Sequence, residues 1–153
     1  MNLHSPQVRD RRDDRETAVR TKLILPVVAV LLVTAMPVHA GEFAVLKTEL
    51  ETARKELVSM ILYREKRGPE QQKKVKDTAD AVSAHLARMK APEGRAAQFK
   101  ELKETWAAFK TTRETELVPA ILAGEKEKAE KTGAGIQKER LEKCYALIPV
   151  LDK

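Results

Sequence analysis

The sequence predicts an all-α protein: an up-down-up-down antiparallel four-helix bundle that follows an N-terminal signal segment. Apolar residues after position 40 recur in alternating steps of four and three, the period of an amphipathic helix. Glycine and proline interrupt this period and leave four helical segments joined by short connections. Aromatic residues make up only 4% of the chain, and β-branched residues are sparse after position 40, which disfavours a β-sandwich or barrel.

Residues 23–40 have the layout of a secretory signal peptide. The apolar run LILPVVAVLLVTAM follows Arg20 and Lys22, and Val38 and Ala40 supply small residues before a cleavage site. The run is shorter than the roughly 20 residues of a membrane-spanning helix. We therefore expect cleavage after Ala40 and a periplasmic protein. The alternative is an uncleaved segment that tethers the protein to the inner membrane.

Residues 1–22 form a polar leader in which acidic and basic residues follow one another without an apolar period, so we expect it to be disordered. So long and acid-containing a leader is unusual before a signal segment, and we expect translation to begin at Val19. The folded domain is then residues 41–153, and no linker within it indicates a second domain.

The net charge of +6 does not indicate nucleic-acid binding. Residues 1–40 carry six Lys or Arg and four Asp or Glu, which leaves a net charge of +4 on the remaining chain. There the cations alternate with glutamates, as in Lys47, Glu49, Glu51 and Arg54, a pattern typical of solvated helix faces. We therefore expect no nucleic-acid partner.

The first two helices are expected on either side of Gly68 and Pro69. The first covers residues 42–67, and the second runs from Pro69 to a break at residues 91–94. Proline suits the first position of a helix because its missing N–H costs no hydrogen bond there. The expected core positions are Leu46, Leu50, Ala53, Leu57 and Met60 in the first helix, and Val75, Ala79, Val82, Leu86 and Met89 in the second.

The third helix is expected to end at Gly124 and to be kinked or weakened near Pro119, which removes one backbone hydrogen bond. The fourth helix follows from Glu125, and Gly133 and Gly135 should make its first half the least stable part. The expected core positions are Phe99, Leu102, Trp106, Phe109, Leu117 and Ile121 in the third helix, and Ala129, Gly133, Ile136, Leu141, Cys144, Ile148 and Leu151 in the fourth.

The sequence contains no nucleophile elbow, no glycine-rich phosphate loop and no paired-histidine motif, so we expect no catalysis. One cysteine and three scattered histidines are too few for a zinc site, and we expect no metal and no cofactor. Cys144 lies on the apolar stripe, where a buried small hydrophobic residue is expected. An interchain disulfide or a redox role is the alternative.

Helical cytochromes use the same architecture, which raises haem binding as an alternative function. Covalent attachment through C-x-x-C-H is absent, because Cys144 is followed by Tyr-Ala-Leu-Ile. Non-covalent ligation by Met60 and His85 requires both side chains on the inner faces of neighbouring helices. Met60 as core filler and His85 as a flank residue are the simpler interpretations.

Three arginines are candidate ligand-binding residues. Arg113 interrupts the apolar stripe of the third helix, Arg140 lies where the stripe of the fourth helix slips, and Arg64 lies near the end of the first. A guanidinium in the wall of a bundle needs a partner that offsets its desolvation, such as a ligand carboxylate. The alternative is a local pair with Glu114, Glu116 or Glu139, or extension of the side chain to water.

Residues 106–148 resemble the second half of the four-helix-bundle sensory module of bacterial methyl-accepting chemotaxis receptors. The resemblance rests on an aromatic and a lysine before Thr-Arg-Glu, on the Leu-Ala-Gly turn at residues 122–124, and on Gln137 in the last helix. It implies a sensory fold that binds a small anionic ligand, pairs as a homodimer and contacts a membrane receptor. Such receptors carry a membrane helix on each side of the module, whereas this sequence ends at Lys153, so we expect a free-standing relative.

Three functions therefore remain open. The first is a periplasmic sensor-like module that binds a small ligand or a membrane-protein partner. The second is the haem-binding electron carrier, and the third is a structural envelope adaptor without a ligand. The sequence does not separate the first from the third, because an inward arginine fits a dry core and a binding cleft equally.

Overall fold

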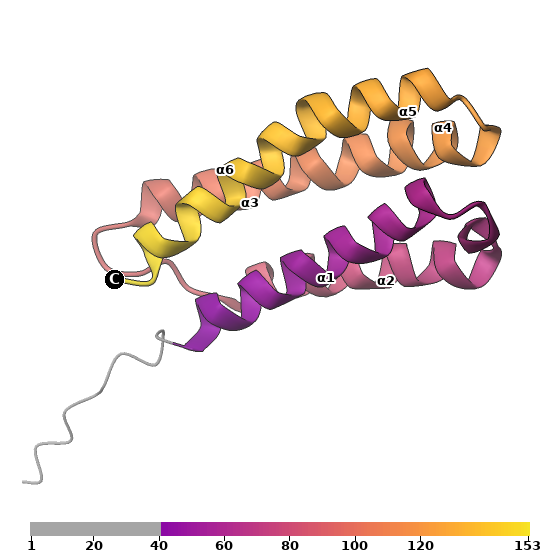
Figure 1. The fold of residues 1–153 in the computed structure, drawn as a ribbon. Coiled ribbons are helices and arrows are strands. Elements are labelled where there is room, and N and C mark those ends of the chain that lie inside the picture. The colour runs from indigo at the N-terminus through magenta and orange to yellow at the C-terminus, as the bar shows by residue number, and fades with distance from the viewer. Residues whose placement is uncertain (1–40) are drawn as a thin grey trace, which may run out of the picture. The chain divides into compact units, whose positions relative to one another are not determined.

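A computed structural model describes residues 41–153, which form four helical segments and contain no strand (Figure 1). The polar leader, the signal segment, its cleavage site and the start at Val19 lie outside these residues. The elements are α1 (Glu42–Leu62), η2 (Arg64–Arg67), α2 (Pro69–Arg88), α3 (Ala96–Thr112), η3 (Arg113–Leu117), α4 (Val118–Ala123), α5 (Lys126–Thr132), η4 (Gly133–Gln137) and α6 (Lys138–Leu151). None of the described helices combines the length and the hydropathy that a membrane crossing requires.

The first connection is more ordered than the sequence predicts. Helix α1 ends at Leu62, five residues before the expected end, and the 3₁₀ turn η2 follows it. Arg67 Nε donates a hydrogen bond to Met60 O at 3.1 Å, which satisfies one of the carbonyls left free at the end of α1. Pro69 is the first residue of α2, as predicted.

The third helical segment consists of α3, η3 and α4. The irregularity expected at Pro119 takes the form of a π turn, η3, which ends just before it. In this turn the N–H of Val118 bonds to Arg113 O, five residues back. Gly124 ends the segment as predicted, with φ +75°, a left-handed conformation that glycine adopts without steric cost.

The fourth helical segment consists of α5, η4 and α6, and it contains a second π turn where the two glycines were expected to weaken it. Gly135 has non-helical angles, φ −92° and ψ −115°. The extra residue of a π turn moves the inward position from 136 to 137. The prediction for Ile136 was therefore wrong. Its side chain is 41% exposed, whereas Gln137 is buried, with only 3% of its surface exposed.

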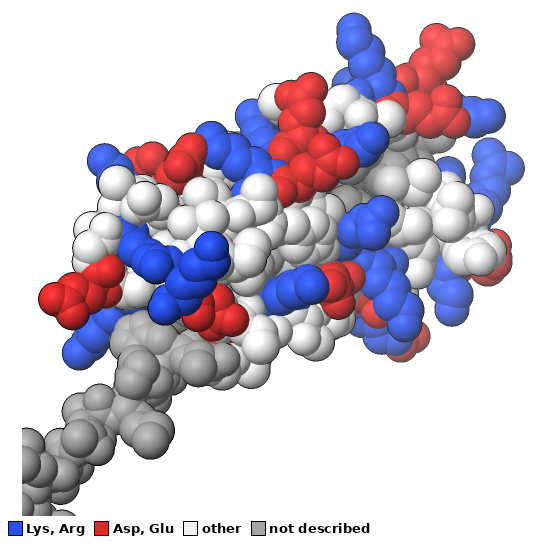
Figure 2. Space-filling model, turned by 60° about the vertical axis from the view of Figure 1, so that its left-hand side comes forward, with Lys and Arg blue, Asp and Glu red and all other residues white. Residues whose placement is uncertain are grey.

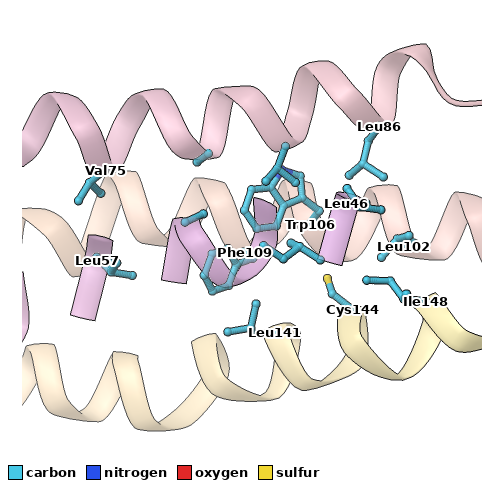
Figure 3. Close-up of a cluster of buried hydrophobic side chains, with 14 of the residues drawn as sticks. Leu46, Leu57, Val75, Leu86, Leu102, Trp106, Phe109, Leu141, Cys144 and Ile148 are labelled. Carbon is cyan, nitrogen blue, oxygen red and sulfur yellow. The ribbon is translucent and has the colours of Figure 1, made fainter. Parts of the chain in front are cut away.

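The core is built by all four segments. Helix α1 packs along α2, and α3 packs along α6, while α1 also contacts α6 and α2 contacts α3 (Figure 1). Figure 3 shows Leu46, Trp106, Leu102 and Cys144 converging from three of these helices. Apart from Gly133 and Ile136, the expected core positions are buried, Cys144 among them as a free thiol.

Candidate functional site

The two π turns lie next to each other in the middle of the third and fourth segments. Helix α5, which leads into η4, contacts η3. A Cβ built on Gly133 would lie 3.9 Å from Leu117 Cδ1, so the two segments approach closely at this point. π turns inside α-helices are frequent at functional sites, and Arg113 and Gln137 lie at the start of one turn and the end of the other.

Arg113 is the charged residue that the structure buries most completely among those it describes. Its side chain is 0% exposed, although an arginine is rarely buried without a partner. Its one ionic contact is weak, because Nη2 lies 3.4 Å from Glu114 Oε1. Nε and Nη1 are buried without a hydrogen-bond partner. Burial lowers the pKa of Arg113, and the guanidinium nevertheless keeps its charge at neutral pH.

Arg113 contributes to the lining of a cavity of 490 Å³, a size typical of small-ligand sites. Helix α2 supplies one wall, and η3 with the start of α4 supplies the other. The lining residues are Gln72, Lys73, Val75, Lys76, Arg113, Glu114 and Val118.

The rim of this Arg113 cavity carries a network of charges. Lys76 and Lys110 both bond to Asp80, and Lys110 Nζ also lies 3.9 Å from Glu114 Oε1. These hydrogen bonds, first that from Lys110, lower the pKa of Asp80 from its usual 3.8 to about 2. Figure 2 shows cations and carboxylates interspersed on one face of the described residues, as the sequence predicts. The positive character of the site therefore depends on Arg113 and the two lysines of α2.

Arg140 has a different role from Arg113. Its Nη1 donates to Ala108 O at 3.0 Å and also to the hydroxyl of Thr112. The side chain is half-buried and binds α6 to the end of α3. Its hydrogen bonds go to α3 and to no neighbouring glutamate, so Arg140 does not form the local pair considered from the sequence.

Arg64 lies away from both other arginines. It is exposed on η2 and lines a separate cavity of 290 Å³ together with Arg67, Lys126 and Glu130. The three arginines predicted as ligand-binding residues therefore do not converge on one site. Only Arg113 is both buried and short of partners.

The part of the site that α2 contributes was not predicted from the sequence. Gln72, Lys73 and Lys76 complete the Arg113 cavity, and they flank Val75, the core residue that does carry a periodic signal. Gln137 is buried at the end of η4, four residues before the core residue Leu141. A count backwards from Leu141 in steps of four would have indicated Gln137 in place of Ile136.

The structure separates the two residues considered as haem ligands. His85 Nδ1 lies 2.8 Å from Glu49 Oε2, so His85 lies opposite Glu49 of α1. Met60 is eleven residues further along α1 and is fully buried, which puts it roughly 16 Å away at the rise of an α-helix. The two side chains cannot bind one iron.

The comparisons with known proteins add no relative. No protein-family model, no curated protein and no solved structure matches this chain.

Proposed function

We propose that residues 41–153 form a sensory module that binds a small anionic ligand, most simply a carboxylate, in the Arg113 cavity. The observation that carries the proposal is the state of the Arg113 guanidinium. It is fully buried, it lines a cavity, and two of its nitrogens lack a hydrogen-bond partner. A planar carboxylate that binds a guanidinium side-on or end-on uses Nη2 with Nε or with Nη1, so it would engage one unpaired nitrogen and replace the weak contact of Nη2 with Glu114.

The energetic argument is one of desolvation. A buried guanidinium loses its hydration, and the loss is offset only by well-formed hydrogen bonds to an anion or a carbonyl. The contact with Glu114 involves one nitrogen at 3.4 Å, and Glu114 keeps 41% of its side chain in solvent. A bound carboxylate would supply the missing acceptors, and Lys73 and Lys76 at the rim would add attraction for its charge.

Access to Arg113 requires a movement of side chains, because Arg113 has no exposed surface of its own. Lys73 and Lys76 are the long, flexible members of the lining, and their side chains are 74% and 67% exposed. Their ion pairs with Asp77 and Asp80 are of the surface type, which contributes little stability. The cost of displacing these two lysines is therefore small compared with a bidentate bond to Arg113.

The wider setting is part of the same proposal. The four segments follow an up-down-up-down order, which is supported by short connections and by the packing of α1 on α2 and of α3 on α6. Residues 23–40 direct the protein to the periplasm. The resemblance of residues 106–148 to chemoreceptor modules supports a homodimer that presents its ligand state to a membrane receptor.

The test is a thermal-shift screen of the purified protein with a panel of small mono- and dicarboxylates. A ligand at a hundredfold excess over its Kd stabilises the folded state by about 2.7 kcal/mol, which raises Tm measurably. We expect one of the carboxylates to raise Tm, and Arg113→Met to abolish that rise. The matched control is Arg88→Met, which removes an exposed arginine of α2 and should leave the rise unchanged.

Two results would contradict the proposal. If a carboxylate raises the Tm of Arg113→Met as much as that of the wild type, the ligand does not bind in the Arg113 cavity. If no carboxylate of the panel raises Tm, the structural adaptor is favoured. Arg113 would then contact a protein partner in place of a small ligand.

A further inference from the structure

A second cavity, of 400 Å³, lies on the α1 side of the two π turns and shares no residue with the Arg113 cavity. Most of its wall is apolar and includes Leu57 of α1, Phe109 of α3, Leu117 of η3 and Leu141 of α6. The lining also contains three exposed charged residues, Arg54, Lys138 and Glu142. Figure 3 shows Phe109 and Leu141 beside each other, with Leu57 on the neighbouring helix. We call this space the Gln137 cavity, after the buried polar residue in its lining.

Two polar atoms of the lining are buried without a hydrogen-bond partner. They are the side-chain carbonyl oxygen of Gln137, Oε1, and the hydroxyl of Tyr145. Native proteins rarely leave such atoms unpaired, because each one costs the desolvation of a polar group. Both atoms belong to residues that line the cavity, so an occupant that forms a hydrogen bond with either of them would offset part of this cost.

The orientation of the Gln137 amide is fixed by its other end. Nε2 donates to Phe109 O at 3.1 Å, so the amide nitrogen is used within the protein. The oxygen is then the group left free, and it is an acceptor only. The occupant must therefore bring a donor, an O–H or an N–H, to Oε1.

The cavity depends on a missing side chain. Gly133 lies in its lining with helical angles, φ −67° and ψ −45°, which every residue adopts. The backbone conformation therefore does not demand glycine at this position. A Cβ there would only touch Leu117 at ordinary contact distance, whereas a longer side chain would extend into the space.

We propose that the Gln137 cavity binds a small, neutral, ring-sized molecule with one hydroxyl or amine donor, of the phenol or alkyl-alcohol class. The apolar wall favours an uncharged hydrocarbon body, since transfer of an ion into it would cost its hydration. The free acceptor Oε1 calls for a hydrogen-bond donor, which separates this ligand class from the anion of the Arg113 cavity. A volume of 400 Å³ is within the range of small-molecule pockets.

The experiment compares two probes of nearly equal shape by titration calorimetry on the full chain. They are 4-ethylphenol, which carries the donor, and 4-ethyltoluene, which replaces the hydroxyl by a methyl group. We expect 4-ethylphenol to bind one molecule per chain at least tenfold more tightly than 4-ethyltoluene. Gln137→Met keeps the length of the side chain and removes the acceptor, so it should erase most of this tenfold preference.

A pair of glycine variants tests the location. Gly133→Leu should fill the space and abolish binding of 4-ethylphenol, while the control Gly133→Ala should bind as the wild type does. Circular dichroism verifies that each variant is helical, and if Gly133→Leu fails to fold, the Gln137→Met comparison alone decides.

Three outcomes would overturn the inference. They are the absence of 4-ethylphenol binding to the wild type, equal affinity for the two probes, and unaltered binding by a folded Gly133→Leu. If the wild type instead binds neither probe and forms a dimer that Gly133→Leu dissociates, the Gln137 cavity is part of an interface between two copies of the chain and binds no small ligand.

Discussion

Arg140 of α6 donates a hydrogen bond to Thr112, the residue that directly precedes Arg113. The guanidinium of Arg140 donates to the Thr112 hydroxyl and to Ala108 O, at the last turn of α3. The backbone that carries Arg113 into the interior is thus held by the fourth helical segment. Arg140 donates two hydrogen bonds to α3, whereas Nε and Nη1 of Arg113 are buried without a partner.

The two hydrogen bonds of Arg140 predict a loss of stability when this arginine is replaced. Arg140→Met removes both bonds of a charged donor, so it should lower the free energy of unfolding by about 2 kcal/mol. Urea denaturation followed by circular dichroism measures this change. The control Arg88→Met lies at an exposed position and should change it by less than about 0.5 kcal/mol. A similar loss of unfolding free energy in both variants would show that the hydrogen bonds of Arg140 to α3 do not stabilise the fold.

Asp80 predicts how stability depends on pH. Its pKa is lowered to about 2 in the folded state by hydrogen bonds from Lys110 and Lys76, so the unfolded chain binds the proton more tightly. Its contribution is therefore present above pH 3.8, its usual pKa, and is lost as the pH falls through about 2. We expect Asp80→Asn to cost about 1 kcal/mol at pH 7, since the side chain is 38% exposed and solvent screens the pair.

Chemical denaturation at pH 7 and pH 2 measures the Asp80 effect, and the gap between variant and wild type should close at the lower pH. The matched control is Asp77→Asn, because the Lys73–Asp77 pair lies on the same helix and both its side chains are more than half exposed. That variant should change the free energy of unfolding by less than about 0.5 kcal/mol at pH 7. A gap that persists at pH 2 would contradict the assignment to the carboxylate charge.

Cys144 is predicted to be unreactive in the folded protein. Burial raises the pKa of its thiol to about 12, and the thiolate is the reactive form. At pH 8 a thiol reagent such as dithionitrobenzoate should label the protein only at the rate of unfolding. The same sample in guanidinium chloride should react completely within minutes. Rapid labelling without denaturant, or a covalent dimer on a non-reducing gel, would show that Cys144 is accessible.

The helix ends illustrate what local sequence can determine. Gly68 with Pro69 and Gly124 were expected to separate helices, and they do so because proline and a left-handed glycine act on their own backbone. The apolar stripe likewise identified the core of α1 and α2, since both helices keep an undisturbed period. It also indicated that Arg113 points inward, because that residue interrupts the stripe at a core position.

The positions that the sequence misplaced all depend on contacts between distant segments. The π turn η4 moves Gln137 into the core and Ile136 out of it, and the sequence shows this insertion only as a slip of the four-three pattern between Ile136 and Leu141. Arg140 was grouped with Arg113, although its partners lie 28 and 32 residues away along the chain. Spacing along one helix carries no information about such partners.

From the sequence alone, residues 41–153 are determined to be all-helical, with four segments, the breaks between them and most of their inner faces. These features follow from interactions within a few residues, which the chain encodes locally. Only the tertiary structure decided which polar groups lack a hydrogen-bond partner and where the two cavities lie. Whether a buried guanidinium or amide is satisfied depends on the atoms that other helices bring within hydrogen-bond distance.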